Sequence, residues 1–112
     1  MINLKKMNTE IEVLSEENVF ESIIQNEIIE IFNKKLDKTV EMKHDDIFFF
    51  DKKSEIKIKN KTEYEYTFCN LIDSIDYHVH VLSYENDNKI TTEMIIYYYV
   101  CNKPVIAGFS KF

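Results

Sequence analysis

The stretch YHVHVLSYENDNKITTEMIIYYYVC (residues 77–101) sets the fold class that we expect for this chain. Polar and apolar residues alternate in both of its halves, and the turn-forming residues ENDN (85–88) separate them. This pattern is typical of two antiparallel β-strands joined as a hairpin. An even-length loop built on residues 85–88 predicts three cross-strand pairs: Tyr84 with Lys89, His80 with Glu93, and His78 with Ile95.

This register gives the hairpin two faces of different chemistry, because successive side chains of a strand point to opposite sides. The mostly apolar face is the natural core face and carries Tyr77, Val79, Val81, Thr92, Met94 and Ile96. The opposite face carries His78, His80, Leu82, Glu93, Ile95, Tyr97 and Tyr99. We therefore expect both histidines to lie on a surface away from the main core.

The segment EENVFESIIQNEIIEIFNKKL (16–36) predicts an amphipathic α-helix that precedes the strands. Its apolar stripe, at spacings of three to four residues, consists of Phe20, Ile23, Ile24, Ile28, Ile31 and Phe32, and Leu36 extends it. Its exposed side carries Glu17, Glu21, Glu27 and Glu30. Ser15 is the expected N-cap. The preceding TEIEVL (9–14) alternates polar and apolar residues and fits either a short strand or the lead-in to the helix; we favour the strand.

The remaining segments predict further strands. TVEMKH (39–44) and IFFFD (47–51) are expected strands, and the second of them is expected to be buried. EIKIKNKTEYEYTF (55–68) predicts a hairpin with a three-residue loop (60–62), because this loop separates the apolar face from the charged face. The loop predicts two apolar pairs: Ile58 with Tyr64 and Ile56 with Tyr66. The last strand, PVIAGF (104–109), opens with Pro104, which an edge strand tolerates.

These elements predict a single α+β domain over residues 1–112. We expect one long N-terminal amphipathic helix packed on a twisted antiparallel sheet of about five strands, since this arrangement buries both apolar surfaces. The element order resembles that of cystatin-like and NTF2-like proteins. The resemblance covers topology alone, because the Gln-x-Val-x-Gly loop with which cystatins block cysteine proteases is absent, and it implies no function.

The composition narrows the classes of partner. The formal net charge is −6, and all 14 basic residues are lysine. The lack of arginine disfavours a nucleic-acid reader, because bidentate contacts to bases rely on arginine, and the acidity disfavours anionic membranes. A partner attracted by charge would therefore be basic. The sequence has no apolar run of the kind found in a signal peptide or a membrane span, so we expect a cytoplasmic protein.

Chemical motifs are sparse. His78, His80 and Glu93 match the ligand count of a facial iron triad or a catalytic zinc site. A strand face implies no pocket, however, and Glu93 is more simply a cross-strand partner of His80. HDD (44–46) is expected to be a turn with a capping aspartate, and both cysteines, Cys69 and Cys101, are expected to be small buried hydrophobes. We expect no metal, no cofactor and no catalytic residue, and hence no enzyme.

The hypothesis that we prefer is a small acidic cytoplasmic binding protein that neutralises a protein partner. Immunity proteins against bacterial toxins, many of which are basic nucleases, have this general character. The chain is short, acidic, free of arginine and rich in residues with AT-rich codons, and one sheet face is rich in tyrosine and carboxylate. The expected partner-binding residues are His78, His80, Glu93, Tyr97, Tyr99, Glu17 and Glu21. Two alternative covers for this face are the N-terminal segment and a second copy of the chain in a homodimer.

Two other functions stay open. A phage or viral antagonist of host defence could use the helical glutamates as a nucleic-acid mimic. An NTF2-like small-molecule-binding protein or enzyme would need a hollow between the helix and the sheet.

Overall fold

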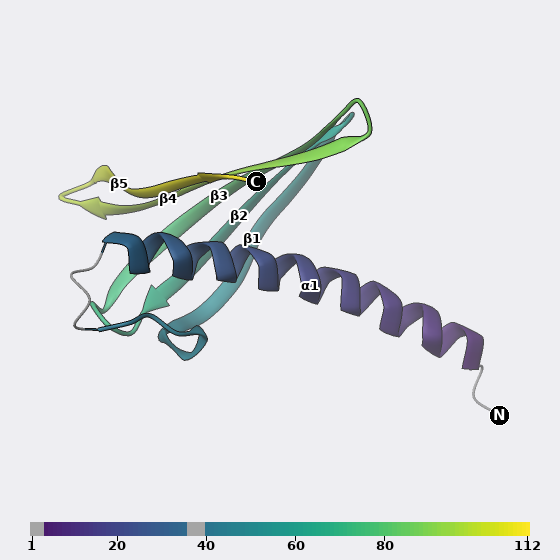
Figure 1. Ribbon diagram of the computed structural model, residues 1–112, viewed down its shortest axis with the longest axis horizontal. Coiled ribbons are helices and arrows are strands. Elements are labelled where there is room, and N and C mark those ends of the chain that lie inside the picture. The colour runs from purple at the N-terminus through teal and green to yellow at the C-terminus, as the bar shows by residue number, and fades with distance from the viewer. Residues whose placement is uncertain (1–3, 36–39) are drawn as a thin grey trace.

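The computed structural model describes residues 4–35 and 40–112, with the side chains of residues 19–34 and 40–112. The described residues form one α-helix packed against a five-stranded antiparallel sheet, which confirms the expected α+β fold (Figure 1). The elements are α1 (Leu4–Lys35), the 3₁₀ helix η1 (His44–Asp46), β1 (Ile47–Ile58), β2 (Lys61–Asn70), β3 (Ile75–Asn86), β4 (Lys89–Val100) and β5 (Lys103–Lys111). The strands follow chain order across the sheet, so β1 and β5 are its edges, and Pro104 lies at the start of an edge strand as predicted.

Helix α1 covers one face of the sheet, which we call the inner face; the opposite one is the outer face. The C-terminal half of the helix crosses the sheet, whereas its N-terminal turns extend past it (Figure 1). The helix backbone comes close to β5, and the Ser110 hydroxyl donates a hydrogen bond of 2.8 Å to Glu27 Oε2. Within the described part of the chain, no helix combines the length and apolar character needed to cross a membrane.

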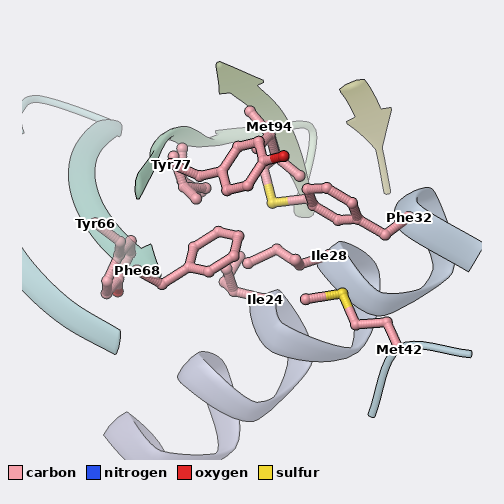
Figure 2. Packing of buried hydrophobic residues seen from close by; sticks show 11 residues of the cluster. Ile24, Ile28, Phe32, Met42, Tyr66, Phe68, Tyr77 and Met94 are labelled. Atoms are coloured by element: carbon pink, nitrogen blue, oxygen red, sulfur yellow. The ribbon is translucent and has the colours of Figure 1, made fainter. Parts of the chain in front are cut away.

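The core lies between α1 and the inner face, where the predicted stripe and the predicted core face meet. Ile24, Ile28 and Phe32 of α1 point toward the sheet (Figure 2). They pack against buried residues of three strands: Tyr66, Phe68, Tyr77, Val79, Val81, Met94 and Ile96. The ring of Phe32 meets that of Tyr77 edge-on at a centroid distance of 5.0 Å. Each buried side chain of this size contributes about 1.5–3 kcal/mol to folding. Ile23 departs from the prediction, since 43% of its surface is exposed.

The helix begins earlier than the sequence predicts. Residues 9–14, which we expected to form a short strand, belong to α1, and Ser15 lies inside the helix instead of at its N-cap. The alternating pattern of TEIEVL was misleading because its apolar positions 11 and 14 also fit helical spacing. Leu36, which was expected to extend the apolar stripe, and Thr39, the first residue of the expected strand 39–44, lie outside the described residues.

The chain that follows the helix is anchored at Met42. The Asn33 side chain of α1 donates from Nδ2 to the Met42 carbonyl (3.2 Å) and accepts from the Met42 N–H (2.8 Å) at Oδ1. Residues 40–43 are therefore not the strand that TVEMKH predicted. The HDD turn is confirmed as η1, and Asp46 Oδ2 caps it by accepting a hydrogen bond of 2.9 Å from the Lys43 N–H.

Strand β1 begins with the IFFFD run, but the run is not buried as expected. Phe49 is 75% exposed and Phe48 is also exposed, whereas Phe50 stacks on Tyr66 with a centroid distance of 4.8 Å. The pairing with β2 shifts between Phe48 and Asp51, and Phe49 has a φ of 52°. A bulge of this kind turns neighbouring side chains to new directions, so one phenylalanine of the run packs on the core and two do not.

The loop between β1 and β2 contains Lys59 and Asn60, so the predicted three-residue loop is wrong. The observed pairs are Ile58 with Lys61 and Ile56 with Glu63. A second register shift, between Lys52 and Ser54, changes which side chains of β1 face the helix. Both isoleucines consequently lie exposed on the outer face.

The last two hairpins, β3–β4 and β4–β5, turn through residues with positive φ. Asp87 (50°) and Asn88 (63°) join β3 to β4, and Cys101 (51°) and Asn102 (64°) join β4 to β5. Two successive residues with positive φ are typical of type I′ turns, whose twist matches that of the flanking strands. Cys101 is exposed in its turn, so its expected burial is wrong, and Cys69 is half-buried.

Candidate functional site

The outer face of β3 and β4 carries the residues that the sequence predicts for it. The members on these strands are His78, His80, Leu82, Glu93, Ile95, Tyr97 and Tyr99. They alternate with inner-face residues that are buried beneath α1. Both histidines thus lie on the side of the sheet opposite the helix, where His80 is exposed and His78 is half-buried.

The partners across the hairpin differ from the prediction. The observed pairs are His78 with Tyr97, His80 with Ile95, and Leu82 with Glu93. The cause is the loop, which contains only Asp87 and Asn88, because the strands continue pairing to Asn86 and Lys89. Each partner therefore moves by two residues, and an even shift leaves every side chain on its original face.

Three aromatic rings form a cluster on this face. His78 stacks on Tyr97 with centroids 5.2 Å apart and an interplanar angle of 13°. Tyr99 meets His78 at 5.2 Å and Tyr97 at 5.7 Å, in both cases nearly perpendicular. Offset-stacked and edge-to-face pairs of this kind are favourable beyond their area of contact. The ring contacts therefore orient His78 and Tyr97 relative to each other and to Tyr99.

A carboxylate and an open hollow lie beside the aromatic cluster. The hollow has a volume of about 230 Å³, its rim includes Glu65, Thr67, His78 and Tyr97, and Tyr66 and Val79 also line it. Partial burial, followed by the nearby Tyr99 and the charge of Glu65, raises the pKa of Tyr97. Glu65 acts on Tyr97 because both residues line this hollow.

An apolar band continues from the cluster onto β4 and β5. Thr67, His78, Tyr97 and Ile106 lie in one row across four strands, and Ile95 pairs with Phe109 in the neighbouring row. Ile106 is 67% exposed and Phe109 is 58% exposed. These two residues were not among the predicted partner-binding residues, although the apolar run PVIAGF (104–109), which contains both, was the signal that could have identified them.

Glu93 does not join the histidines. It pairs with Leu82 and lies 3.9 Å from the Lys111 ammonium, in a salt bridge on the β5 side of the sheet. The predicted His80–Glu93 pair is therefore wrong. In residues 19–34 and 40–112, no three histidine, cysteine or carboxylate side chains come together as a metal-binding group.

The helical glutamates lie in a different place from the aromatic cluster. Glu21 lines a hollow of about 330 Å³ together with Phe20, Lys52, Lys57 and Tyr64, on the inner side of the sheet. The Glu17 side chain lies outside the described residues. Glu21 therefore does not share a surface with His78 or Tyr97.

The half-buried cysteine has little nucleophilic character. Desolvation, followed by the charge of Asp76 across the strand pair, raises the pKa of the Cys69 thiol. A raised pKa keeps a thiol protonated at neutral pH, and the thiol is a much weaker nucleophile than the thiolate.

Comparison with protein-family models, with curated proteins and with solved structures gave no match for this chain. The resemblance of its element order to cystatin-like and NTF2-like proteins therefore stays a prediction from sequence. The outer face, with its aromatic cluster, its apolar band and Glu65, is the feature of the described structure from which a function can be inferred.

Proposed function

We propose that this chain is a small acidic cytoplasmic protein that binds and neutralises a basic protein partner, in the manner of an immunity protein against a bacterial toxin. The observation that carries the proposal is the outer face, where aromatic and apolar side chains are exposed beside carboxylates. Tyr99, Ile106 and Phe109 are each more than half exposed, and they are contiguous with Ile95 and Tyr97. Exposed apolar patches bordered by polar groups mark interaction surfaces, and tyrosine is a frequent anchor residue in them.

Electrostatics supports a basic partner. The net charge of −6 would accelerate association with a cationic protein and would disfavour nucleic acid. A toxin of the nuclease class fits this requirement because its own substrate-binding surface must be positively charged.

The alternatives receive less support. Buried side chains pack the core between α1 and the sheet (Figure 2), and the hollow beside Glu21 lies outside this core cluster, so an enclosed site for an NTF2-like ligand has less support. A nucleic-acid mimic would need a free array of helical carboxylates, but Glu27 accepts a hydrogen bond from Ser110 and is half-buried.

The test is co-expression of this chain with the toxin candidate encoded beside it, with growth of the host cells and the dissociation constant (Kd) of the purified complex as readouts. We expect rescue of growth and a tight complex. Ile95→Ala and Tyr99→Ala should each raise the Kd about tenfold, as expected for anchor residues.

Ile90→Ala is the matched control. Ile90 lies on the same strand and is 73% exposed, but it is on the inner face beyond the cover of the helix. It should leave the Kd within about twofold of the original value, since residues away from an interface contribute little. Failure of the chain to relieve toxicity, or an equal loss of affinity in all three variants, would contradict the proposal.

A further inference from the structure

We propose that the hollow on the outer face seats one arginine side chain of the partner, bound by the Glu65 carboxylate and the rings of His78 and Tyr97. This inference rests on the proposed function and specifies the chemistry of its central contact. The hollow is open to solvent on the outer face of β2, β3 and β4, with the aromatic cluster on one side and Glu65 and Lys53 on the other. A side chain that enters it therefore meets a carboxylate and aromatic surface together.

Glu65 is available for a cation. Its side chain is exposed, and among the side chains that the structure describes it has no hydrogen bond or ion pair. The nearest lysine on the rim, Lys53, is already engaged, since its ammonium lies 2.9 Å from Asp51 Oδ2. An incoming cation would therefore meet an unneutralised carboxylate, and would not have to displace an existing partner of Glu65.

The aromatic rings favour a cation of planar shape. Tyr97 and Tyr99 stand at 83° to each other, and His78 lies parallel to Tyr97. A cation that contacts the face of such a ring gains about 0.5–2 kcal/mol, according to how far it is desolvated. A guanidinium can stack on a ring and bind a carboxylate with two parallel hydrogen bonds, whereas an ammonium acts as a point charge. These requirements select arginine over lysine.

The probes are three capped pentapeptides, Gly-Gly-Xaa-Gly-Gly, in which Xaa is arginine, lysine or citrulline. Citrulline is nearly isosteric with arginine but carries no charge. Each peptide is titrated into the full ¹⁵N-labelled chain, and amide chemical shifts report the Kd and the place of binding. For arginine we expect saturable shifts centred on Thr67, His78 and Tyr97. The citrulline peptide should bind at least about tenfold more weakly, because it lacks the charge-assisted hydrogen bonds.

The decisive variant is Glu65→Gln, with Glu63→Gln as its matched control. Glu63 lies two residues away on the same strand and on the same face, and it is also exposed. Glu65→Gln should raise the Kd for the arginine peptide at least about fivefold, and Glu63→Gln should change it less than about twofold. Unchanged amide shifts elsewhere in both variants verify that the fold is intact.

Several outcomes would overturn the inference. The first is a set of amide chemical-shift changes that spread over all acidic surfaces and do not saturate. The second is binding of the citrulline peptide as tight as that of the arginine peptide. Equal binding of the lysine peptide would refute the selection of arginine, and an unchanged Kd in Glu65→Gln would refute the role of the carboxylate. These measurements need no toxin. If the chain neutralises a toxin, and Glu65→Gln binds that toxin as tightly as the original chain does, only this inference is overturned. If the arginine peptide binds but the chain does not neutralise the toxin, only the proposed function is overturned.

Discussion

Gly108 of β5 lies against Ile31 of α1 so closely that a β-carbon at position 108 would overlap Cγ2 of Ile31. Gly108 is buried and is the only glycine in the sequence. Its φ is not in the left-handed region, so the backbone alone does not require glycine there. The missing side chain is what allows the helix to approach the edge strand.

Gly108→Ala should therefore destabilise the protein by about 1–3 kcal/mol, the usual cost of overpacking a well-filled contact. Urea denaturation measures this change in the free energy of unfolding. Ile31→Ala removes the atom that would overlap, so Gly108→Ala should cost clearly less in that background. If Gly108→Ala lowers the free energy of unfolding equally with and without the Ile31→Ala substitution, the helix does not pack against Gly108.

Two isoleucines of α1 should respond very differently to the same substitution. Ile28 is fully buried in the core, whereas Ile23 is nearly half exposed. Ile28→Ala should lower the free energy of unfolding by about 2–5 kcal/mol, because it leaves a cavity. Ile23→Ala should cost less than about 1 kcal/mol. Similar losses, measured by chemical denaturation, would contradict the orientation of the helix on the sheet.

Tyr77 should make stability depend on alkaline pH. Burial, together with the hydrogen bond and the charge of Asp73, raises the pKa of Tyr77; the hydroxyl donates to Asp73 Oδ2 at 2.5 Å. Above the ordinary tyrosine value of about 10, the unfolded chain loses this proton while the folded chain keeps it. The unfolded state then binds fewer protons, so stability falls as pH rises through this window and the contribution is fully present below it.

Tyr77→Phe should cost about 1 kcal/mol at pH 7, through the lost hydrogen bond. It should also reduce the fall in stability between neutral and alkaline pH. Some fall should remain, because the pKa values of Tyr64 and Tyr97 are also raised. Urea denaturation of both proteins at a series of pH values measures how steeply the free energy of unfolding falls with pH in each of them. Equal slopes would refute the assignment to Tyr77.

The exposed turn at Cys101 offers a stabilising substitution. Cys101 has a φ of 51°, a conformation that asparagine adopts more readily than cysteine. Cys101→Asn should raise the free energy of unfolding by about 0.5–1 kcal/mol in reducing buffer. Cys101→Val, which also removes the thiol, should lower it, because a β-branched residue tolerates positive φ poorly. A stabilising valine would contradict the turn geometry.

The faces of β3 and β4 could be predicted from sequence because alternation with a period of two is a strong signal. Val79 and Val81 on one side and His78 and His80 on the other kept their faces, although every cross-strand partner was wrong. The error lay in the length of the loop, which has two residues instead of the predicted four, and this even difference moved each partner by two without moving a side chain across the sheet.

The predicted pairing of the first hairpin, β1 with β2, was wrong for a different reason. Two register shifts in β1 changed which of its side chains face the helix, and no residue type in IFFFD or KKSE announces a bulge. The separation of charged and apolar faces therefore favoured a pairing of Ile56 with Tyr66 that the structure does not have.

The candidate site was predicted in part. Tyr97, Tyr99 and the histidines were assigned to the outer face from the alternation, but Glu65 was not among the predicted site residues. The contact between the two hairpins depends on how β2 pairs with β3, where Glu65 lies opposite His80. Neither strand carries a signal for that register, because the turn between them has no strong sequence signature.

The hydrogen bond between Ser110 and Glu27 joins residues 83 positions apart. Helix α1 precedes all five strands of the sheet in the chain, yet part of its cover comes from β5, the strand farthest from it in sequence. During translation, the apolar stripe of the helix stays without its full cover until β5 has left the ribosome, and an exposed apolar stripe is a ligand for chaperones. Loss of β5 would thus uncover the side of α1 that faces Gly108 and Ser110, although β2, β3 and β4 would still cover the buried stripe of the helix, so a product without β5 should bind chaperones longer than the full chain does.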